Sequence, residues 1–575
     1  MFAGKRAERD AIIADMKATR APYEQLWRDV DLSVCPGMLR LNLSDQNKGI
    51  RDDALILNST PDKCFQTFKN GMISTNTNPS QPWLEIAAED PGMNAYGPYA
   101  VFFDYVANLM LAVTEDAGVY EDFKDIFGCS GKFGSSILTM EENLDRVVHT
   151  QPLAMGSWWV GLDQFGDPNA LYREMRLTVR QTVERFLDRR KPDWSKVTRK
   201  VKDAYQAGRY QEAVDVGHLV MPNDGYNPRY TEAKEKAFYS CYFELGEQAQ
   251  NEKDKLLRES GYDEFPGLYF PWDRFGDDVY GIDSPGIMSL PDNKELNHWS
   301  EKIDNALDKM VDPALMGPPS LKSVGAAAWR PGGYIAMNDS DLQRGGLRPI
   351  HDINPEVLRV LDREDKIERR IKDAWYTEVF KYLDAVDKSA RTATEIIARQ
   401  QHNMRELVGT MNRLNRGVLS PYSERLFNNL VRQGRIGGEY GIPIPDGLEG
   451  ANLKIRYISQ MAQAMRSVNI SGMDQMMDTA IKIANEGQNP QVWNKVNIYS
   501  FMEEKARAMD IPARIMRGEE EVVALEEAQA KAQAQQQQME QMQALTKGVK
   551  DLAASPTDGK NALTDVANAI GKQVA

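Results

Sequence analysis

Hydrophobic residues recur every three or four positions over three long segments in the second half of the chain, the spacing of α-helices that bury one face. The first helix is expected over 292–312, after a capping arrangement at Asp292–Glu295. The second is expected over 355–383, because Asn354 is a good N-cap residue and Pro355 suits the first helical position.

The third helical segment is the longest. It begins with the capping box Thr392-Ala-Thr-Glu395 and keeps its apolar spacing to Leu430. At 1.5 Å per residue, about 38 residues give a rod of roughly 57 Å, which we expect to be kinked near Pro421. Few small enzymes need such a rod.

Three stretches between and after these helices have a different composition. Residues 313–354 hold too many glycines and prolines for a helix, so a loop or small-strand insert is expected there. Residues 384–391 are short and polar. From Glu519 to Leu545 the chain is dominated by Glu, Ala and Gln, which predicts either a long exposed helix or disorder, because large apolar residues are too few for a separate core.

The first half begins with helices. One is expected over the first 30 residues, with a break at Pro22, and another between Pro98 and Gly118.

From about residue 135 the apolar period changes from 3.6 to two, which indicates strands. Segments 158–163 and 170–177 predict a β-hairpin, and Thr178–Gln181 predicts a capping box that opens a helix. Further extended segments are expected at 214–221 and 237–245. The fold class is therefore α+β, predominantly helical.

The composition is that of a large acidic globular protein. The chain has 575 residues, of which 42% are hydrophobic, and 84 acidic against 70 basic side chains give a net charge of −14. This length predicts roughly three or four folding units. The acidity argues against a generic nucleic-acid coating protein, since non-specific affinity for phosphates needs an excess of Lys and Arg. Any DNA contact must be local.

Signals for secretion, membranes and metals are missing from the sequence. The N-terminus has no apolar core of a signal peptide, and no run approaches the ~18 apolar residues of a membrane span. The four cysteines make no C-x-x-C pair, so we expect neither a zinc site nor a disulfide framework.

No catalytic motif or cofactor motif is present. The five histidines include no H-E-x-x-H pair, so each is expected to be structural or exposed. Gly128–Gly134 has the glycine density of a phosphate loop without its G-x-x-x-x-G-K frame, and a tight turn entering a strand is the favoured interpretation. The acids of Asp273–Asp283 lack the spacing of a calcium loop. An enzyme is not expected.

A dense run of both charges lies between Asp362 and Asp373, within the second expected helix. The favoured interpretation is a solvated face with pairs at i,i+4. The alternative is a surface that packs against neighbouring copies of the chain.

Several segments together resemble the portal, or head-to-tail connector, proteins of short-tailed bacteriophages. The resemblance extends over roughly residues 20–520, and each motif alone is weak, whereas their order and spacing are specific. Gln460-Met461 departs from the family pattern, which has a Pro-Leu pair there. The matching segments are Gly71–Ser74, Pro82–Leu84, Tyr280–Gly286, Lys294–Asn297, Arg330–Gly333, Thr392–Ile396, Arg413-Leu414, Pro421, Arg425–Phe427, the loop 434–445 and Ile458–Ala464.

The resemblance implies a portal fold assembled as a ring of about twelve subunits at one capsid vertex, through which DNA is packaged and ejected. It divides the chain into regions. These are an N-terminal α+β wing (1–291), a first stem helix (292–312), a clip (313–354), a second stem helix (355–383), a channel loop (384–391), a long kinked wing helix with its loop (392–450), a helical wing or crown (451–518) and a C-terminal crown or tail (519–575).

The implied partners are other copies of the chain, the large terminase, tail adaptor and tail proteins, and the major capsid and scaffolding proteins. Double-stranded DNA would pass through the channel without sequence specificity. The resemblance places the protein in the virion, assembled in the cytoplasm of the bacterial host, with no membrane and no cofactor.

Basic residues of three regions are then candidates for contacts. Lys388 and Arg391 would place about 24 positive charges around the channel, where they could centre or grip the duplex; the alternative is that they cap neighbouring helices. Contacts of the clip with acidic partners or neighbouring subunits are expected from Arg330, Arg344 and Arg348. Contacts between stems are expected from Arg363, Lys366, Arg369 and Arg370.

Two other classes of protein compete with this interpretation. A packaging ATPase would need a phosphate loop, which the sequence lacks. A capsid scaffolding or head-tail adaptor protein without a DNA channel could share the acidic, Gln-rich tail, but would not need two stem helices, an insert and a basic loop.

Overall fold

The computed structural model divides into two units. The first unit is formed by residues 1–85, 106–443 and 455–468. The second unit is formed by residues 86–105, 444–454 and 469–575. The residues that the structure describes are 6–44, 56–88, 98–188, 191–227, 235–246, 255–311, 315–316, 339–343, 348–349, 359–384, 407–439, 441–445, 447–448, 453–457, 460–485, 496–509, 515 and 519–553.

The first unit starts with the helical segment expected from the sequence. α1 (Arg6–Arg20) and α2 (Glu24–Val34) are separated by one 3₁₀ turn, Ala21–Tyr23, which holds Pro22. The predicted break is therefore confirmed, although it is only one turn long. α2 buries Trp27 completely, and the Trp27 indole donates to the carbonyl of Phe133 at 3.0 Å.

A five-stranded antiparallel sheet has the order β4-β5-β6-β7-β8. The predicted hairpin is confirmed as its first two strands, and both further extended segments are also strands. The bounds are β4 (Trp158–Leu162), β5 (Pro168–Thr178), β6 (Ala213–Pro222), β7 (Phe238–Glu244) and β8 (Arg258–Tyr262).

Helices cover both faces of this sheet. Ile13 and Met16 of α1 pack against one face, which carries Trp159, Leu219 and Phe243. On the opposite face lie α6 (Val179–Phe186) and α7 (Arg199–Gln206). The predicted capping box at the start of α6 is present, with reciprocal bonds between Thr178 and Gln181.

A second sheet, of order β3-β2-β9, packs on α5 and continues the first unit. Its strands are antiparallel, and Leu138 of the central strand is paired with Pro152 on one side and Leu268 on the other. The bounds are β2 (Ser135–Asn143), β3 (Val147–Pro152) and β9 (Gly267–Pro271).

The glycine-rich segment 128–134 corrects a sequence prediction. Apart from Gly134 it is not a turn but the last part of the buried helix α5 (Val119–Phe133). Its glycines allow α5 to approach α3 (Thr60–Asn76), since a Cβ on Gly131 would lie 2.3 Å from Phe68. Gly134, at φ +100°, ends the helix and leads into β2.

Lys132, in the same segment, is fully buried and bonded to α2. Its Nζ donates to Asp31 Oδ1 at 2.6 Å and to the carbonyl of Cys35 at 2.7 Å. The Asp31 carboxylate also accepts from the backbone N–H groups of Gly37 and Met38. The α5 backbone beside this ion pair supports the next helices, because the Ser284 hydroxyl donates to the Lys132 carbonyl at 3.3 Å.

The first long helix of the second half is confirmed as α10 (Leu290–Val311), preceded by the single turn α9 (Pro285–Met288). The expected cap at Asp292 is wrong, because the helical turns begin earlier, where the Ser284 hydroxyl accepts from the backbone of Ile287. Gly286 is needed here, since a Cβ would lie 2.3 Å from the Lys132 carbonyl oxygen.

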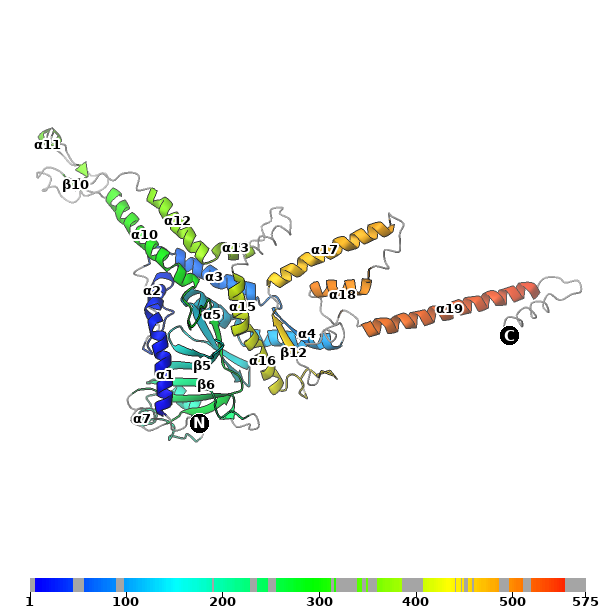
Figure 1. Cartoon of the computed structure of the whole chain (residues 1–575), viewed down its shortest axis with the longest axis horizontal. Coiled ribbons are helices and arrows are strands. Elements are labelled where there is room, and N and C mark those ends of the chain that lie inside the picture. Colours follow the sequence, from blue (N-terminus) through cyan, green and yellow to red (C-terminus); the bar gives the residue numbers. More distant parts are fainter. Residues whose placement is uncertain are drawn as a thin grey trace, which may run out of the picture. The chain divides into compact units, whose positions relative to one another are not determined.

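The second long helix is interrupted. It consists of α12 (Arg359–Ala374) and α13 (Thr377–Asp384), separated at Trp375 and Tyr376, whereas the sequence predicted one helix over 355–383. Tyr376 has a φ of +53°. α10 and α12 lie side by side (Figure 1).

The described part of the insert agrees with small strands. β10 (Leu315–Met316) pairs antiparallel with β11 (Arg348–Pro349), and Asp339–Gln343 forms the short helix α11.

The third helical segment is described from residue 407, and its capping box lies outside the described residues. α15 (Val408–Leu414) and α16 (Ser420–Arg432) are joined by a π-helical turn, Asn415–Leu419. The irregularity therefore precedes the expected kink at Pro421, which sits in the first turn of α16, where proline is tolerated. Gly417 packs in the π turn, where a Cβ would lie 2.2 Å from the Tyr269 carbonyl oxygen.

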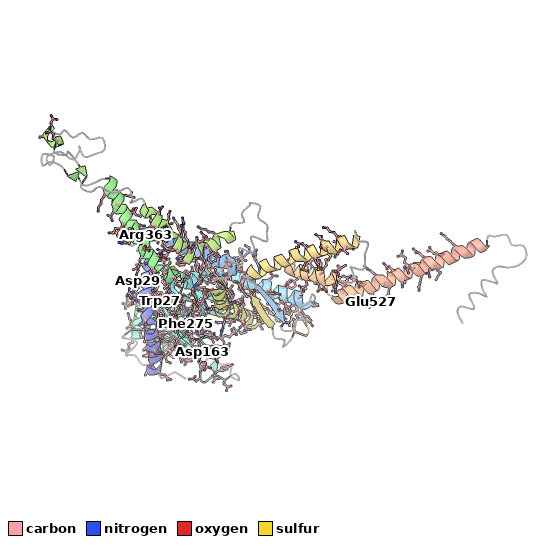
Figure 2. The ribbon with its side chains drawn as sticks, turned by 45° about the horizontal axis from the view of Figure 1, so that its top comes forward. Trp27, Asp29, Asp163, Phe275, Arg363 and Glu527 are labelled. Atoms are coloured by element: carbon pink, nitrogen blue, oxygen red, sulfur yellow. The ribbon has the colours of Figure 1, made fainter. Side chains whose placement is uncertain are left out.

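The remaining elements include the predicted helix after Pro98, which is confirmed as α4. The C-terminal tract is a long exposed helix over its described residues, so this alternative is confirmed over disorder, and Glu527 is one of its exposed side chains (Figure 2). The bounds are β1 (Leu84–Ala88), α4 (Pro98–Asp116), β12 (Leu453–Tyr457), α17 (Gln460–Asn485), α18 (Ile498–Ala508) and α19 (Glu519–Ala553).

The buried Lys132–Asp31 pair generates a stability prediction. Asp31→Asn keeps the shape of the side chain but leaves the Lys132 ammonium without its counter-charge, so we expect the free energy of unfolding of the first unit to fall by about 3–5 kcal/mol. Chemical denaturation followed by tryptophan fluorescence measures this loss. Lys236→Met, which breaks the exposed Lys236–Asp263 pair, is the control and should cost less than about 1 kcal/mol. Equal losses in the two variants would contradict the prediction.

Candidate functional site

The charged residues of α12 bind mainly to neighbouring elements of the same chain. Arg363 donates to Glu295 Oε1 of α10 at 2.8 Å, and its guanidinium lies 4.7 Å from the ring centre of Trp299. Arg370 donates to the other oxygen of Glu295 at 2.7 Å and pairs with Asp292 at 3.1 Å. Hydrogen bonds from Arg363 and Arg370 lower the pKa of Glu295. The two arginines therefore hold α10 and α12 together through one carboxylate (Arg363 is labelled in Figure 2).

Acidic residues of α12 make further contacts across the helix pair. Glu364 accepts from Ser300 of α10 at 2.7 Å and from Asn58 at 3.2 Å. Glu368 accepts from the same Asn58 amide at 3.2 Å and from Lys372 at 2.9 Å. Within the described part of α12, the Lys372–Glu368 bond is the one ion pair at i,i+4. The favoured interpretation of the charge run, a solvated face with such pairs, thus accounts for only one of these contacts.

Two of the four bases expected between stems form no ion pair among the described residues. Lys366 and Arg369 are exposed on α12 and form no ion pair with any residue that the structure describes. Arg363 and Arg370, in contrast, are engaged with α10. The four predicted residues thus differ in their contacts within the chain, and their contacts between subunits stay a prediction.

The other sequence-predicted residues fall in or beside segments outside the described residues. Lys388 and Arg391 of the expected channel loop lie there, as do Arg330 and Arg344 of the insert. Arg348 is part of β11, where it is paired with Met316 of β10. The predictions for these five residues stay predictions.

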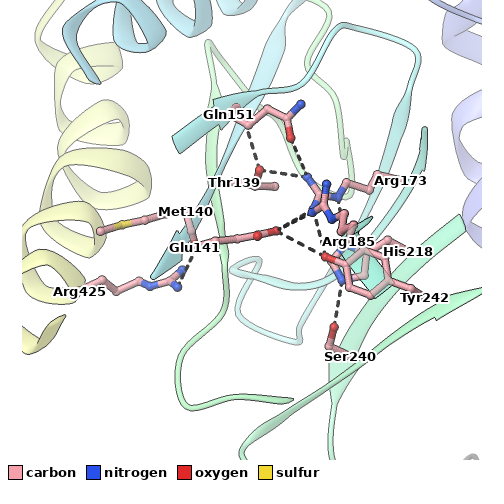
Figure 3. A network of polar contacts seen from close by, with 10 residues as sticks. All are labelled: Thr139, Met140, Glu141, Gln151, Arg173, Arg185, His218, Ser240, Tyr242 and Arg425. Atoms are coloured by element: carbon pink, nitrogen blue, oxygen red, sulfur yellow. Dashed lines mark hydrogen bonds and ion pairs between the residues drawn. The ribbon is translucent and has the colours of Figure 1, made fainter. Parts of the chain in front are cut away.

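Arg173 of β5 is the centre of a buried polar network that the sequence analysis did not find (Figure 3). Its Nε donates to His218 Nδ1 at 2.9 Å, and its Nη2 donates to Glu141 Oε1 at 2.9 Å and to the Tyr242 hydroxyl at 3.3 Å. Nη1 donates to Thr139 Oγ1 at 3.2 Å. The guanidinium thus connects the three-stranded sheet with the five-stranded sheet.

The hydrogen bonds of His218 fix its protonation. Because Arg173 can only donate, Nδ1 must accept, and the proton is on Nε2, which donates to Ser240 Oγ at 2.9 Å. The imidazole also stacks on the Tyr242 ring at 3.8 Å. Burial, with the nearby positive charges of Arg173 and Arg185, lowers the pKa of His218 well below its usual value. His218 is therefore neutral and structural, as the sequence analysis allowed.

This network resembles a catalytic triad only in its residue types. A serine-histidine pair is activated when a carboxylate holds the second imidazole nitrogen, whereas here a guanidinium does so and makes the histidine less basic. Ser240 and His218 are also buried, with 0% and 1% of their surfaces exposed. The arrangement joins strands and is unsuited to nucleophilic catalysis. Its sequence signal was an arginine and a histidine at inward positions of two expected strands.

Two arginines in segments that match the portal family attach α15 and α16 to the sheets. Arg425 of α16 donates to the carbonyl oxygens of Phe265 and Met140, both at 2.9 Å. Arg413 of α15 donates to the Trp272 carbonyl at 3.0 Å and pairs with Asp273 at 2.9 Å. These contacts fix α15 and α16 against the strand β9 and its neighbours.

Metal sites and membrane spans are both missing from the described residues. Within the described ranges, no group of three His, Cys, Asp or Glu side chains could hold a metal ion. None of the described helices is both long and apolar enough to cross a membrane.

Comparisons with known proteins agree over nearly the whole chain. The family model for "Bacteriophage head to tail connecting protein" matches residues 6–516. The portal protein of Salmonella phage epsilon15 is 28% identical over 560 residues, which cover 97% of this chain and 97% of that protein. A probable portal protein of Bordetella phage BPP-1 is 26% identical over 559 residues, 96% of each chain.

Solved structures match less closely. A chain from the neck of an empty GTA particle, computed with C6 symmetry, aligns with 76% of this chain and 90% of its own length at 12% identity and a TM-score of 0.34. A superposition this loose establishes no shared fold.

The Arg173–His218 contact predicts a pH dependence. The unfolded histidine takes up a proton near pH 6.5, but the folded one does so only at a lower pH, so stability should fall as the pH drops below about 6.5. Between pH 7 and 5 this loss amounts to as much as about 2 kcal/mol. His218→Gln should lose correspondingly less over the same range, as measured by denaturant unfolding at both pH values. His298→Gln, at an exposed position, controls for removal of a histidine, and an unchanged pH dependence in His218→Gln would contradict the account.

Proposed function

Since the chain belongs to the bacteriophage head to tail connecting protein family, we propose that it is a portal subunit, which forms a ring of about twelve copies at one capsid vertex. The ring is the channel for DNA packaging and ejection. The observation that carries this proposal is the match over residues 6–516, together with portal proteins that are similar over 96–97% of the chain.

The described elements fit the parts of such a subunit. α10 and α12 are the two stem helices, joined through Glu295, and the insert between them is the clip. The sheets of the first unit, with α15 and α16, form the wing. Residues 384–391 form the channel loop, and the C-terminal helices form the crown.

The acidity of the chain suits a channel that DNA must slide through. Each phosphate neutralised by a Lys or Arg strengthens binding and would retard the duplex. Twelve copies of a chain with net charge −14 carry −168, so the assembly as a whole repels DNA. Lys388 and Arg391 add rings of positive charge at one level, which centre or grip the duplex there.

The stem bases have two roles in this proposal. Arg363 and Arg370 hold α12 to α10 within a subunit. Lys366 and Arg369, which form no ion pair with the described part of the chain, contact the neighbouring subunit. Asp304 and Asp308 are exposed on α10 and offer acidic contacts for the bases of a neighbouring α12. Contacts between unlike surfaces of identical subunits close a ring.

The partners follow from the position of a portal. Arg330, Arg344 and Arg348 of the clip contact the large terminase, the tail adaptor or neighbouring subunits. The outer surface of the ring contacts the major capsid and scaffolding proteins. The protein resides in the virion and is assembled in the host cytoplasm. A structural role without catalysis suits the buried Arg173 network.

The mass of the purified protein tests the proposal. Native mass spectrometry should find closed oligomers of about twelve chains of 64.9 kDa, without nucleotide hydrolysis. A stable monomer that binds capsid or tail proteins would favour the scaffolding or adaptor alternative. A monomer with ATP turnover would favour a packaging motor.

Reversing the charges of Lys366 and Arg369 should weaken the ring. The double variant Lys366→Glu, Arg369→Glu changes the charge of the proposed contact by −4 per subunit. We therefore expect the association constant of assembly to fall at least about tenfold, most strongly at low salt. Analytical ultracentrifugation at two salt concentrations measures this change. The control is Lys191→Glu with Lys196→Glu, the same reversal at two exposed bases of the first unit that form no ion pair with a described residue. Unchanged assembly of the stem variant would show that Lys366 and Arg369 do not contact a neighbour.

A further inference from the structure

The interruption between α12 and α13 lies at Tyr376, whose side chain disfavours the backbone angles found there. Tyr376 has a φ of +53°, in the left-handed region that side chains other than glycine seldom adopt. Helical hydrogen bonds flank it on both sides, from the Tyr376 N–H to the Asp373 carbonyl at 3.0 Å and from the Phe380 N–H to the Tyr376 carbonyl at 3.2 Å. One residue's backbone angles therefore separate two helices.

Nothing in the local sequence requires this interruption. Residues 370–384 contain no glycine or proline, and their composition favours one continuous helix. A conflict between local preference and observed structure marks a site that tertiary contacts hold in place.

Those tertiary contacts are aromatic and lie on both sides of Tyr376. Trp375 is fully buried between Phe65 and Phe68, and its indole donates to Ser289 Oγ at 3.1 Å. Phe380 of α13 packs on Phe68 with a ring-centre distance of 5.8 Å.

Gly71 of α3 makes the Phe380 contact possible. A Cβ on Gly71 would lie 2.2 Å from the Phe380 ring, so α3 accepts α13 only because residue 71 has no side chain. The docked α13 also buries Thr377, whose hydroxyl has no partner among oxygen and nitrogen atoms of the described residues and faces the thiol of Cys64.

We propose that α13 has two states: the docked state, with Tyr376 left-handed and Phe380 against Gly71, and an undocked state in which Tyr376 is right-handed and α12 continues into α13 as one helix. The first state gains aromatic burial and the second relieves the backbone at Tyr376. This device goes beyond the proposed portal function, and it gives the end of α13 at Asp384 two positions.

Cys64 reports which state is present. Its thiol is 3% exposed beneath α13, next to Thr377, and becomes accessible when α13 leaves α3. Cys129 and Cys241 are also buried, with 7% and 2% exposed, but lie elsewhere in the first unit and report opening of the unit as a whole.

The experiment is maleimide labelling of the full-length native protein, with the rate at each cysteine read by peptide mass spectrometry. Cys64 should label at least about tenfold faster than Cys129 and Cys241, because local opening is more frequent than global opening. Equal, slow labelling of all three thiols would overturn the proposal.

A matched pair of variants tests the role of Tyr376. Tyr376→Gly and Tyr376→Ala both remove the ring, but glycine adopts a positive φ readily while alanine favours the continuous helix. Cys64 should therefore label at least about tenfold more slowly in Tyr376→Gly than in Tyr376→Ala. Equal rates, or faster labelling of the glycine variant, would overturn the proposal.

A third variant acts on the docking surface. Gly71→Ala places a methyl group where Phe380 packs and should accelerate labelling of Cys64 at least about tenfold while Cys129 and Cys241 stay slow. If all three thiols become reactive, the substitution has unfolded the unit, and the Tyr376 pair decides the outcome.

Discussion

The first unit depends on the last turn of α5, because this turn buries a lysine and forms the hydrogen bonds that hold α2, α9 and α10. The Lys132 ammonium must have a counter-charge in the core, and Asp31 of α2 supplies it at 2.6 Å. The carbonyl of Phe133 accepts from Trp27, and that of Lys132 accepts from Ser284, directly before α9 and α10. The start of the α10 and α12 helix pair is thus bonded to the buried last turn of α5.

From the last turn of α5, polar contacts extend in two directions. Along the helix pair, Glu295 of α10 binds Arg363 and Arg370 of α12. Towards the sheets, Arg173 joins β2 to the five-stranded sheet, and Arg425 joins β2 to α16. A subunit built in this way holds its long helices at a fixed place on its core, which suits a ring whose channel must keep its dimensions while DNA passes.

Much of this architecture could be predicted from local patterns. The hairpin at residues 158–177, the capping box at Thr178 and the helix after Pro98 follow from periodicity and from residues whose backbone preferences are strong. The expected cap at Asp292 was wrong for a local reason, since the helix begins earlier. Two other wrong predictions concern long-range contacts. Gly128 and Gly131 admit neighbouring side chains to a helix, although the sequence alone suggested a turn. Tyr376 ends a helix because Trp375 and Phe380 are held by α3, which no local pattern reveals.

The candidate contact residues could likewise be predicted only in part from local patterns. Opposite charges on α12 indicated contacts, but only the structure shows that Arg363 and Arg370 find theirs on α10, whereas Lys366 and Arg369 form none within the described residues. Arg173 escaped detection because its partners come from strands far apart in the sequence.

The most direct test of the central claim is electron cryo-microscopy of the purified full-length protein. The account predicts a closed ring in which α10 and α12 of every subunit surround the central hole. Separate monomers, or a ring with these helices at its outer rim, would contradict it.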